Sequence, residues 1–73
     1  MATNRIESLV TGTVWKLERQ NGDRVAKGET ILIIESMKME ILIDAPAAGT
    51  LRELQVAEGE SVIEGQVLAI VSS

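Results

Sequence analysis

The residues best suited to chemistry stand together in the middle of the chain, where Lys38 lies between Met37 and Met39. Strand-forming residues run on both sides of this triplet, at 31–34 and at 41–43. A charged residue between two such runs is expected where the chain reverses direction, because turns separate the apolar runs of paired strands. We therefore predict that Lys38 lies at the tip of a β-hairpin, with its side chain in solvent.

Composition restricts what other chemistry the chain can perform. The 73 residues include no cysteine and no histidine, which removes disulfides, thiolate chemistry, the usual general base near neutral pH and the commonest metal ligand. A lysine amine is itself a poor nucleophile near neutral pH, because lysine in water titrates at a pKa of about 10.4. We therefore expect a non-catalytic protein whose lysine is acted on by another enzyme.

Charge and apolar patterning give no sign of binding to nucleic acid or membrane. The formal net charge is −4, from seven basic and eleven acidic residues, and the basic residues are scattered. Trp15 is the sole aromatic residue, so bases have no stacking platform; we expect it to cover a small core. The apolar runs, such as those at 31–34 and 67–71, are far too short to cross a membrane, and no signal-peptide core follows the N-terminus. These features predict a soluble cytoplasmic protein.

A repeat at an offset of 37 residues divides the chain into two matching halves. The identical pairs include Gly12 and Gly49, Thr13 and Thr50, Leu17 and Leu54, Gly22 and Gly59, Val25 and Val62, Gly28 and Gly65, and Ile33 and Ile70. Two copies are too few for a solenoid, so we predict two similar halves related by a pseudo-twofold axis. Lys38 lies at their junction, and the chain termini are expected to meet at the opposite end.

Each half has the pattern of short strands separated by glycine turns. Asn21-Gly22-Asp23 and Glu58-Gly59-Glu60 are clear turn signals, because glycine tolerates a positive φ, and Pro46 is expected at a strand edge or bend. No window shows the 3.6-residue apolar period of a helix. We therefore predict a single all-β domain over residues 1–73, a sandwich or flattened barrel. Strands are expected at 6–10, 13–17, around 25, 30–35, 39–44, 50–56, around 62 and 67–71.

From about Ile6 to Val71, the chain resembles the biotinyl/lipoyl attachment family. The resemblance is carried, in order, by Gly12-Thr13-Val14-Trp15-Lys16, Gly22-Asp23-Arg24-Val25-Ala26-Lys27-Gly28, Glu35-Ser36-Met37-Lys38-Met39-Glu40, Ala45-Pro46-Ala47-Ala48-Gly49-Thr50 and Glu58-Gly59-Glu60-Ser61-Val62. It implies a flattened β-barrel or sandwich of two four-stranded antiparallel sheets, a barrel-sandwich hybrid. It also implies that Lys38 carries a covalently attached cofactor.

The residues around Lys38 indicate which cofactor the resemblance implies. Methionines on both sides of the lysine, as at Met37 and Met39, are typical of biotin carriers, whereas lipoyl domains usually have an acidic residue before the lysine and a small or β-branched residue after it. Glu35 occurs in both branches. The resemblance thus implies a biotin carrier that is a substrate of a biotin protein ligase, with Met37, Met39 and Glu35 contributing to ligase recognition. Such a carrier shuttles carboxybiotin between biotin carboxylase and carboxyltransferase components.

The chain departs from some family members in ways that narrow the resemblance. Only residues 18–21 separate the second strand from Gly22, which leaves no room for the protruding thumb of some acetyl-CoA carboxylase carriers. The segment 8–11 lacks the prolines of many members. The chain looks closer to thumbless carrier domains and to small stand-alone attachment proteins, and we expect a monomer in isolation.

Three readings of the motif stay open beside the biotin carrier. One is a lipoyl carrier that serves acyl transfer, and another is a dual acceptor of biotin and lipoate. The third is an unmodified scaffold like efflux adaptor proteins, which lack the lysine motif and carry a helical insertion at the junction. This chain has the motif at Lys38 and no insertion.

Overall fold

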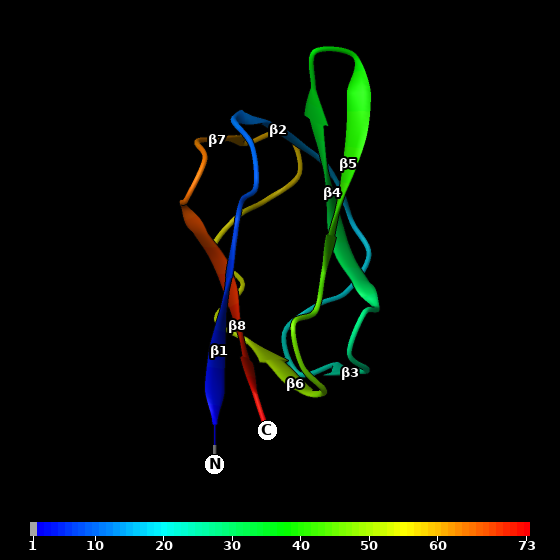
Figure 1. Cartoon of the computed structure of the whole chain (residues 1–73), viewed down its shortest axis with the longest axis vertical. Coiled ribbons are helices and arrows are strands. Elements are labelled where there is room, and N and C mark those ends of the chain that lie inside the picture. Colours follow the sequence, from blue (N-terminus) through cyan, green and yellow to red (C-terminus); the bar gives the residue numbers. More distant parts are fainter. Residues whose placement is uncertain (1) are drawn as a thin grey trace.

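The expected all-β fold class is confirmed by the structure, a computed structural model that describes residues 2–73 (Figure 1). Those residues form eight strands and no helix. The strands are β1 (Thr3–Glu7), β2 (Gly12–Leu17), β3 (Arg24–Val25), β4 (Thr30–Ser36), β5 (Met39–Asp44), β6 (Gly49–Arg52), β7 (Ser61–Val62) and β8 (Val67–Ser72).

The strands pair into two antiparallel sheets that lie side by side with the core between them (Figure 1). One sheet has the order β1-β8-β6-β3 and the other has the order β5-β4-β2-β7. Aliphatic side chains from both sheets meet in the core and exclude water, which is the main favourable contribution to folding in so short a chain. The largest of those that are fully buried are Val14, Ile31, Leu32, Ile34, Leu51, Val62, Leu68 and Val71.

The pseudo-twofold symmetry predicted from the repeat holds down to single hydrogen bonds. Gly22 donates its backbone N–H to the carbonyl of Leu51 at 2.8 Å, and Gly59, 37 residues later, donates to the carbonyl of Val14 at 2.7 Å. Both bonds cross from one half of the chain to the other. Each half therefore satisfies backbone groups of the other half.

The chain termini and the central hairpin lie at opposite ends of an elongated molecule of 36 × 18 × 18 Å, as the repeat predicts (Figure 1). The termini are tied together, because Ser73 donates its backbone N–H to the carbonyl of Ala2 at 3.0 Å. Pro46 lies just after the last residue of β5, Asp44, which agrees with its expected place at a strand end.

The first strand was predicted too late in the sequence. We expected it at 6–10, but β1 spans Thr3–Glu7, and its register with β8 shifts between Ile6 and Glu7, the last pair of the strand. Ser8 then donates its backbone N–H to the carbonyl of Gln66, and its hydroxyl donates to the carbonyl of Val10. These bonds bend the chain, so that the apolar residues after Ser8 leave the sheet.

The strand expected at 50–56 was predicted too long. β6 ends at Arg52 because Glu53 adopts a left-handed backbone conformation with φ of 49°, which no regular strand accommodates. Leu54 donates its backbone N–H to the side-chain oxygen of Asn21 at 2.8 Å. Val56 nevertheless reaches the core from this loop, so the apolar pattern in this segment reflects burial without sheet pairing.

Trp15 does not cover the core as expected. Val14 faces the core, and the pairing of β2 with β4 shifts between Val14 and Lys16. Trp15 occupies that irregular step with its side chain turned outward and 49% exposed. The aliphatic residues of the two sheets fill the core without it.

Candidate functional site

Lys38 lies at the tip of a β-hairpin, as predicted. β4 and β5 pair from Thr30–Asp44 to Ser36–Met39, which leaves Met37 and Lys38 as the two turn residues. Both have left-handed backbone conformations, with φ of 51° and 65°. A two-residue turn with a positive φ at both positions is type I′, whose twist matches that of the flanking strands.

The residue types in this turn oppose its backbone conformation. Type I′ turns favour Asn-Gly because a left-handed conformation costs other L-residues roughly 1–2 kcal/mol each. Here the two positions are Met37 and Lys38. Residues that conflict with local backbone preference are expected where a site needs their side chains. The turn alone therefore does not explain why a methionine and a lysine occupy the tip.

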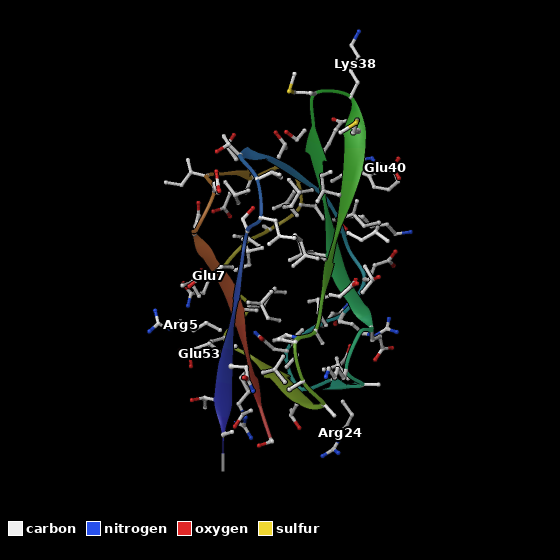
Figure 2. The ribbon with its side chains drawn as sticks, in the orientation of Figure 1. Arg5, Glu7, Arg24, Lys38, Glu40 and Glu53 are labelled. Atoms are coloured by element: carbon white, nitrogen blue, oxygen red, sulfur yellow. The ribbon has the colours of Figure 1, made fainter. Side chains whose placement is uncertain are left out.

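The side chains of the Met-Lys-Met triplet extend into solvent. Met37 is 91% exposed and Met39 is 59% exposed, so neither fills a gap in the core. Lys38 extends beyond the end of the hairpin (Figure 2). In the part of the chain that the structure describes, no hydrogen bond or ion pair holds its amine. The amine is therefore presented to any enzyme that can accommodate a narrow hairpin.

Two carboxylates stand directly below the tip. Glu35 of β4 and Glu40 of β5 are paired across the hairpin and both are exposed. Like charges directly opposite each other destabilise a strand pair, and within residues 2–73 neither forms an ion pair. Glu35, predicted to help ligase recognition, therefore shares the lysine end of the molecule with a second negative charge at Glu40 (Figure 2).

The base of the hairpin is held by contacts that sequence reasoning missed. The hydroxyl of Ser36 donates to the carbonyl of Thr11 at 2.9 Å, and the Thr11 hydroxyl accepts the backbone N–H of Glu64 at 3.0 Å. These bonds connect the last residue of β4 to the loop between β7 and β8. Ala48, the equivalent of Thr11 in the repeat, has no hydroxyl. Comparing the two copies for added polar groups is the signal that marks Thr11.

Gly12 and Gly49 serve a different purpose from the turn glycines. At Gly22, Gly28, Gly59 and Gly65 the backbone has a positive φ, as expected for turns. At Gly12, a Cβ would lie 2.3 Å from the carbonyl oxygen of Glu35, next to the hairpin base. Glycine is needed there because the end of β4 passes too close for any side chain.

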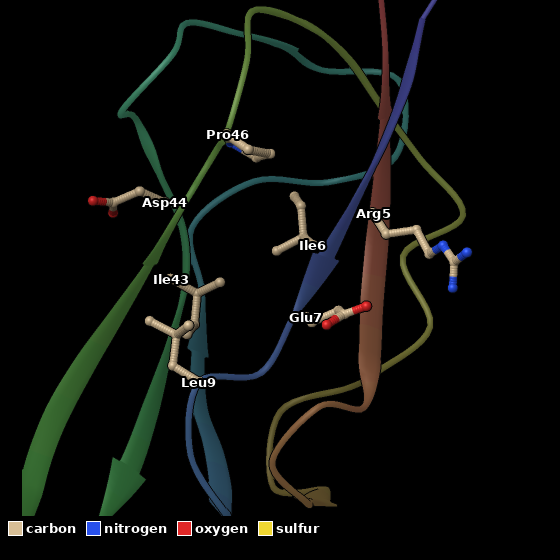
Figure 3. Close-up of a pocket in the computed structure, with 7 residues that line it drawn as sticks. All are labelled: Arg5, Ile6, Glu7, Leu9, Ile43, Asp44 and Pro46. Atoms are coloured by element: carbon tan, nitrogen blue, oxygen red, sulfur yellow. The ribbon is translucent and has the colours of Figure 1, made fainter.

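A shallow cavity of about 240 Å³ lies between the edge strands β1 and β5 (Figure 3). Its lining contains residues related by the repeat, so it sits where the unpaired edges of the two sheets meet. The lining residues are Arg5, Ile6, Glu7, Leu9, Ile43, Asp44 and Pro46. None belongs to the Met-Lys-Met triplet or to the hairpin turn, so the cavity is separate from the candidate site.

Among residues 2–73, no group of three or more acidic, histidine or cysteine side chains is placed to hold a metal ion. None of those residues forms a helix long and apolar enough to cross a membrane.

Comparison with known proteins identifies a family model, a small attachment protein and a much longer enzyme component that are similar to this chain. A family model described as a biotin-requiring enzyme matches residues 4–71. The biotin/lipoyl attachment protein of Bacillus subtilis is 42% identical over 64 residues, which cover 88% of each chain. A dihydrolipoyllysine-residue succinyltransferase component of the 2-oxoglutarate dehydrogenase complex, from Staphylococcus saprophyticus, is 40% identical over 65 residues but only 15% of its length is matched.

The fold is also similar to part of a much larger enzyme. The crystal structure of Kluyveromyces lactis urea carboxylase contains a region that superposes with a TM-score of 0.92 and 29% identity. The match covers 99% of this chain and 6% of that enzyme. The chain therefore spans most of the small attachment protein but a small fraction of the carboxylase.

Proposed function

Because the chain belongs to the family of biotin/lipoyl attachment domains, we propose that it is a non-catalytic biotin carrier loaded on Lys38. The observation that carries this proposal is the hairpin tip, where an exposed lysine lies between two exposed methionines in a type I′ turn. The arrangement fits covalent attachment, because the amine is held away from the body of the domain on a short hairpin that is paired without interruption from Leu32–Ile43 to Ser36–Met39.

Met37 and Met39 support biotin as the cargo, and the similarity to a region of urea carboxylase is consistent with this. The second candidate is a lipoyl carrier or a dual acceptor of both groups. Similarity to the succinyltransferase component favours it, because that relative is named for a dihydrolipoyl-lysine residue. Both candidates use the same amine on the same hairpin, so they differ in the ligase that recognises the tip.

The chemistry of loading is assigned to a biotin protein ligase. The Lys38 amine must lose a proton before it attacks the activated carboxyl carbon, because a lysine ammonium has no lone pair to donate. An amide bond forms, AMP leaves from the acyl-adenylate, and the proton passes to a base of the ligase. This chain contributes the position of the amine and the side chains that the ligase recognises, for which we propose Met37, Met39 and Glu35.

After loading, the carrier contributes delivery. Biotin, when attached, accepts a carboxyl group at one site and gives it up at another. A flexible arm on a rigid hairpin keeps that group near successive active sites at an effective concentration far above that of free cofactor. We propose that the partners are biotin carboxylase and carboxyltransferase components, either on separate chains or as parts of one larger protein.

Intact-mass measurement after incubation with biotin, ATP and a biotin protein ligase tests this proposal. We expect one biotin to be added to the wild-type chain and at least a 100-fold lower rate of addition to Lys38→Arg. Lys27→Arg, at an exposed lysine outside the hairpin, serves as the matched control and should load normally.

Three results would contradict the proposal. Label that persists in Lys38→Arg would refute the site. Acylation of the wild-type chain without any ligase would refute the division of labour. Loading by a lipoate ligase alone would replace biotin by lipoate as the cargo.

A further inference from the structure

An apolar row crosses the outer face of the sheet that carries the lysine hairpin. This apolar row consists of Trp15 on β2, Ile33 on β4 and Leu42 on β5. Trp15 is 49% exposed and Leu42 is 52% exposed, whereas Ile33 between them is 7% exposed. None of the three belongs to the buried core cluster between the sheets.

The strand register places these residues together. Leu32 and Ile34 face the core, so Ile33 faces outward, because successive residues of a strand point to opposite faces. Leu42 is directly opposite Ile33. On the other side Ile33 pairs with the exposed Lys16, and Trp15 occupies the irregular step of β2 just before it. The row is therefore continuous over three strands.

The other sheet shows that the fold does not require this row. By the repeat, Trp15, Ile33 and Leu42 correspond to Arg52, Ile70 and Arg5. Arg5 and Arg52 are both paired with Ile70, so the same three places on the second outer face hold an aliphatic residue between two arginines. The sister sheet thus forms with arginines at two of the three places, so a sheet of this kind does not require apolar side chains at Trp15 and Leu42.

Two unpaired carboxylates border the apolar row on the side of the hairpin tip. Glu35 and Glu40 form the next outward-facing pair along β4 and β5 after Ile33 and Leu42. A partner that covered the row would gain by placing basic side chains against these two carboxylates, since opposite charges across an interface favour docking. Lys16 puts a positive charge beside Trp15, so the surface fits an apolar side chain with lysine or arginine only on the side toward the hairpin tip.

The small size of the apolar row favours a transient partner over a second copy of this chain. A stable dimer buries about 800 Å² on each partner, with roughly 20–30 residues a side, whereas this row offers three side chains and one of them is already covered. Weak contacts suit a carrier, which must leave each enzyme after delivery.

The position of the apolar row separates its partner from the ligase. Leu42 is four residues from Lys38, or about 14 Å along an extended strand. A ligase must act at the amine itself and therefore has to surround the tip. An enzyme that acts on the far end of a long flexible arm gains little from the tip and needs another surface by which to hold the carrier.

We propose that the apolar row is the docking surface for the biotin carboxylase component, an inference that rests on the proposed function as a biotin carrier. This partner binds ATP and bicarbonate, which are both anions, so basic groups near its active site are expected and complement Glu35 and Glu40. The partner places an aliphatic or aromatic side chain against Trp15 and Leu42 and basic groups against the two carboxylates.

The test compares carboxylation of biotinylated variants by the biotin carboxylase of the organism that makes this chain. Labelled bicarbonate supplies the carboxyl group that is transferred to the attached biotin, and ATP is converted to ADP and phosphate. In Trp15→Arg/Leu42→Arg, the outer face copies its sister sheet, which already accepts arginine at both positions. We expect the KM for the carrier to rise at least tenfold with kcat within twofold, while the rate of loading by the ligase stays within twofold.

The control is Arg5→Leu/Arg52→Leu on the sister face, whose KM should stay within twofold of the wild type. The single variant Trp15→Phe should keep a KM for the carrier close to that of the wild type, because phenylalanine keeps an aromatic surface at this position. Thermal unfolding of every variant checks that the fold is retained.

Several results would overturn this inference. These are an unchanged KM in the double arginine variant, an equal loss in the sister-face control, a parallel loss of loading by the ligase, or no carboxylation of the loaded wild-type chain. Sedimentation that showed a wild-type dimer and a monomeric double variant would assign the apolar row to a second copy. If the wild-type chain fails to accept biotin at all, the proposed function fails instead.

Discussion

At one end of the molecule β4 and β5 are joined by Met37 and Lys38, whereas at the other end the equivalent strands β8 and β1 end as the chain termini (Figure 1). The strand pairing is nearly the same at both ends. Glu35 pairs with Glu40 at one end, and Ser72 pairs with Thr3 at the other. Two such strands therefore pair without a turn or a lysine between them, so strand pairing alone does not require Met37 and Lys38 at the hairpin tip.

The comparison separates what both ends need from what only the lysine end has. Both ends need a glycine where two strands approach closely, at Gly12 and at Gly49. Only the lysine end has the hydroxyl contact between Ser36 and Thr11. The shared features should control stability, whereas the unshared ones should control how the lysine is presented.

The largest expected effect comes from adding a methyl group at the two close approaches. In Gly12→Ala the Cβ would lie 2.3 Å from the carbonyl oxygen of Glu35, and in Gly49→Ala it would lie 2.6 Å from that of Ser72. Backbone atoms cannot yield as side chains do, so we expect each change to lower the free energy of unfolding by about 3 kcal/mol. Urea denaturation measures the loss.

Loading by the ligase distinguishes these two variants. Gly12→Ala disturbs the end of β4 next to the hairpin, so its folded fraction should be loaded about tenfold more slowly than the wild type. Gly49→Ala disturbs the opposite end, and its folded fraction should be loaded normally. Equal slowing in both variants would show that the hairpin depends on global stability rather than on its own base.

A smaller effect is expected from the hydroxyl at the hairpin base. Ser36→Ala removes the hydrogen bond to Thr11 and should lower the free energy of unfolding by about 1 kcal/mol. The loading rate should fall two- to fivefold, because the strained turn loses one of its supports. Amide exchange at Met39, which pairs with Ser36, should become faster.

Ser73→Ala is the matched control for this hydroxyl. Ser73 is the repeat equivalent of Ser36, and its hydroxyl hydrogen-bonds with Ala2 at the far end of the molecule. It should leave the loading rate unchanged, and Ser36→Thr should restore most of the rate. A rate in Ser36→Ala equal to that of the wild type would mean that the hairpin positions Lys38 without this contact.

The smallest expected effect concerns an ion pair that only one half contains. Arg19 follows β2 and Glu29 precedes β4, and their side chains are 34% and 31% exposed. The repeat places Val56 and Gln66 at these positions in the other half. The hydrogen bond from Arg19, aided by one from the backbone N–H of Ala26, holds the pKa of Glu29 below its usual value of 4.5. A lowered pKa in the folded state means that folding favours the ionised carboxylate.

The sign of the pH dependence follows from that shift. The stabilisation by Glu29 is present above pH 4.5 and is lost as the pH falls through the lower folded pKa. Glu29→Gln copies Gln66 and can still accept the turn hydrogen bond, as Gln66 does from Ile63. Stability curves between pH 5 and pH 2 should be slightly flatter for Glu29→Gln than for the wild type. An unchanged curve would show that solvent screens this partly exposed pair completely.

The apolar pattern predicted parts of the fold unequally. The hairpin strands were located almost to the residue, since continuous β-branched runs on both sides of a charged turn permit few other pairings. The segments at 8–10 and 53–56 were misassigned because they are held by loop hydrogen bonds to distant parts of the chain, such as the bond from Ser8 to Gln66. Such bonds leave no local trace in the sequence.

By itself the sequence determined the all-β class, the two-copy organisation and the place of Lys38 at the junction, because each depends on local pattern or on similarity between the halves. Only the tertiary structure decided which residues hold the hairpin base, as at Thr11 and Gly12, and that Trp15 faces solvent. The reason is that close approaches and exposed rows depend on strand register between segments far apart in the chain, and one shifted pair moves a side chain to the opposite face.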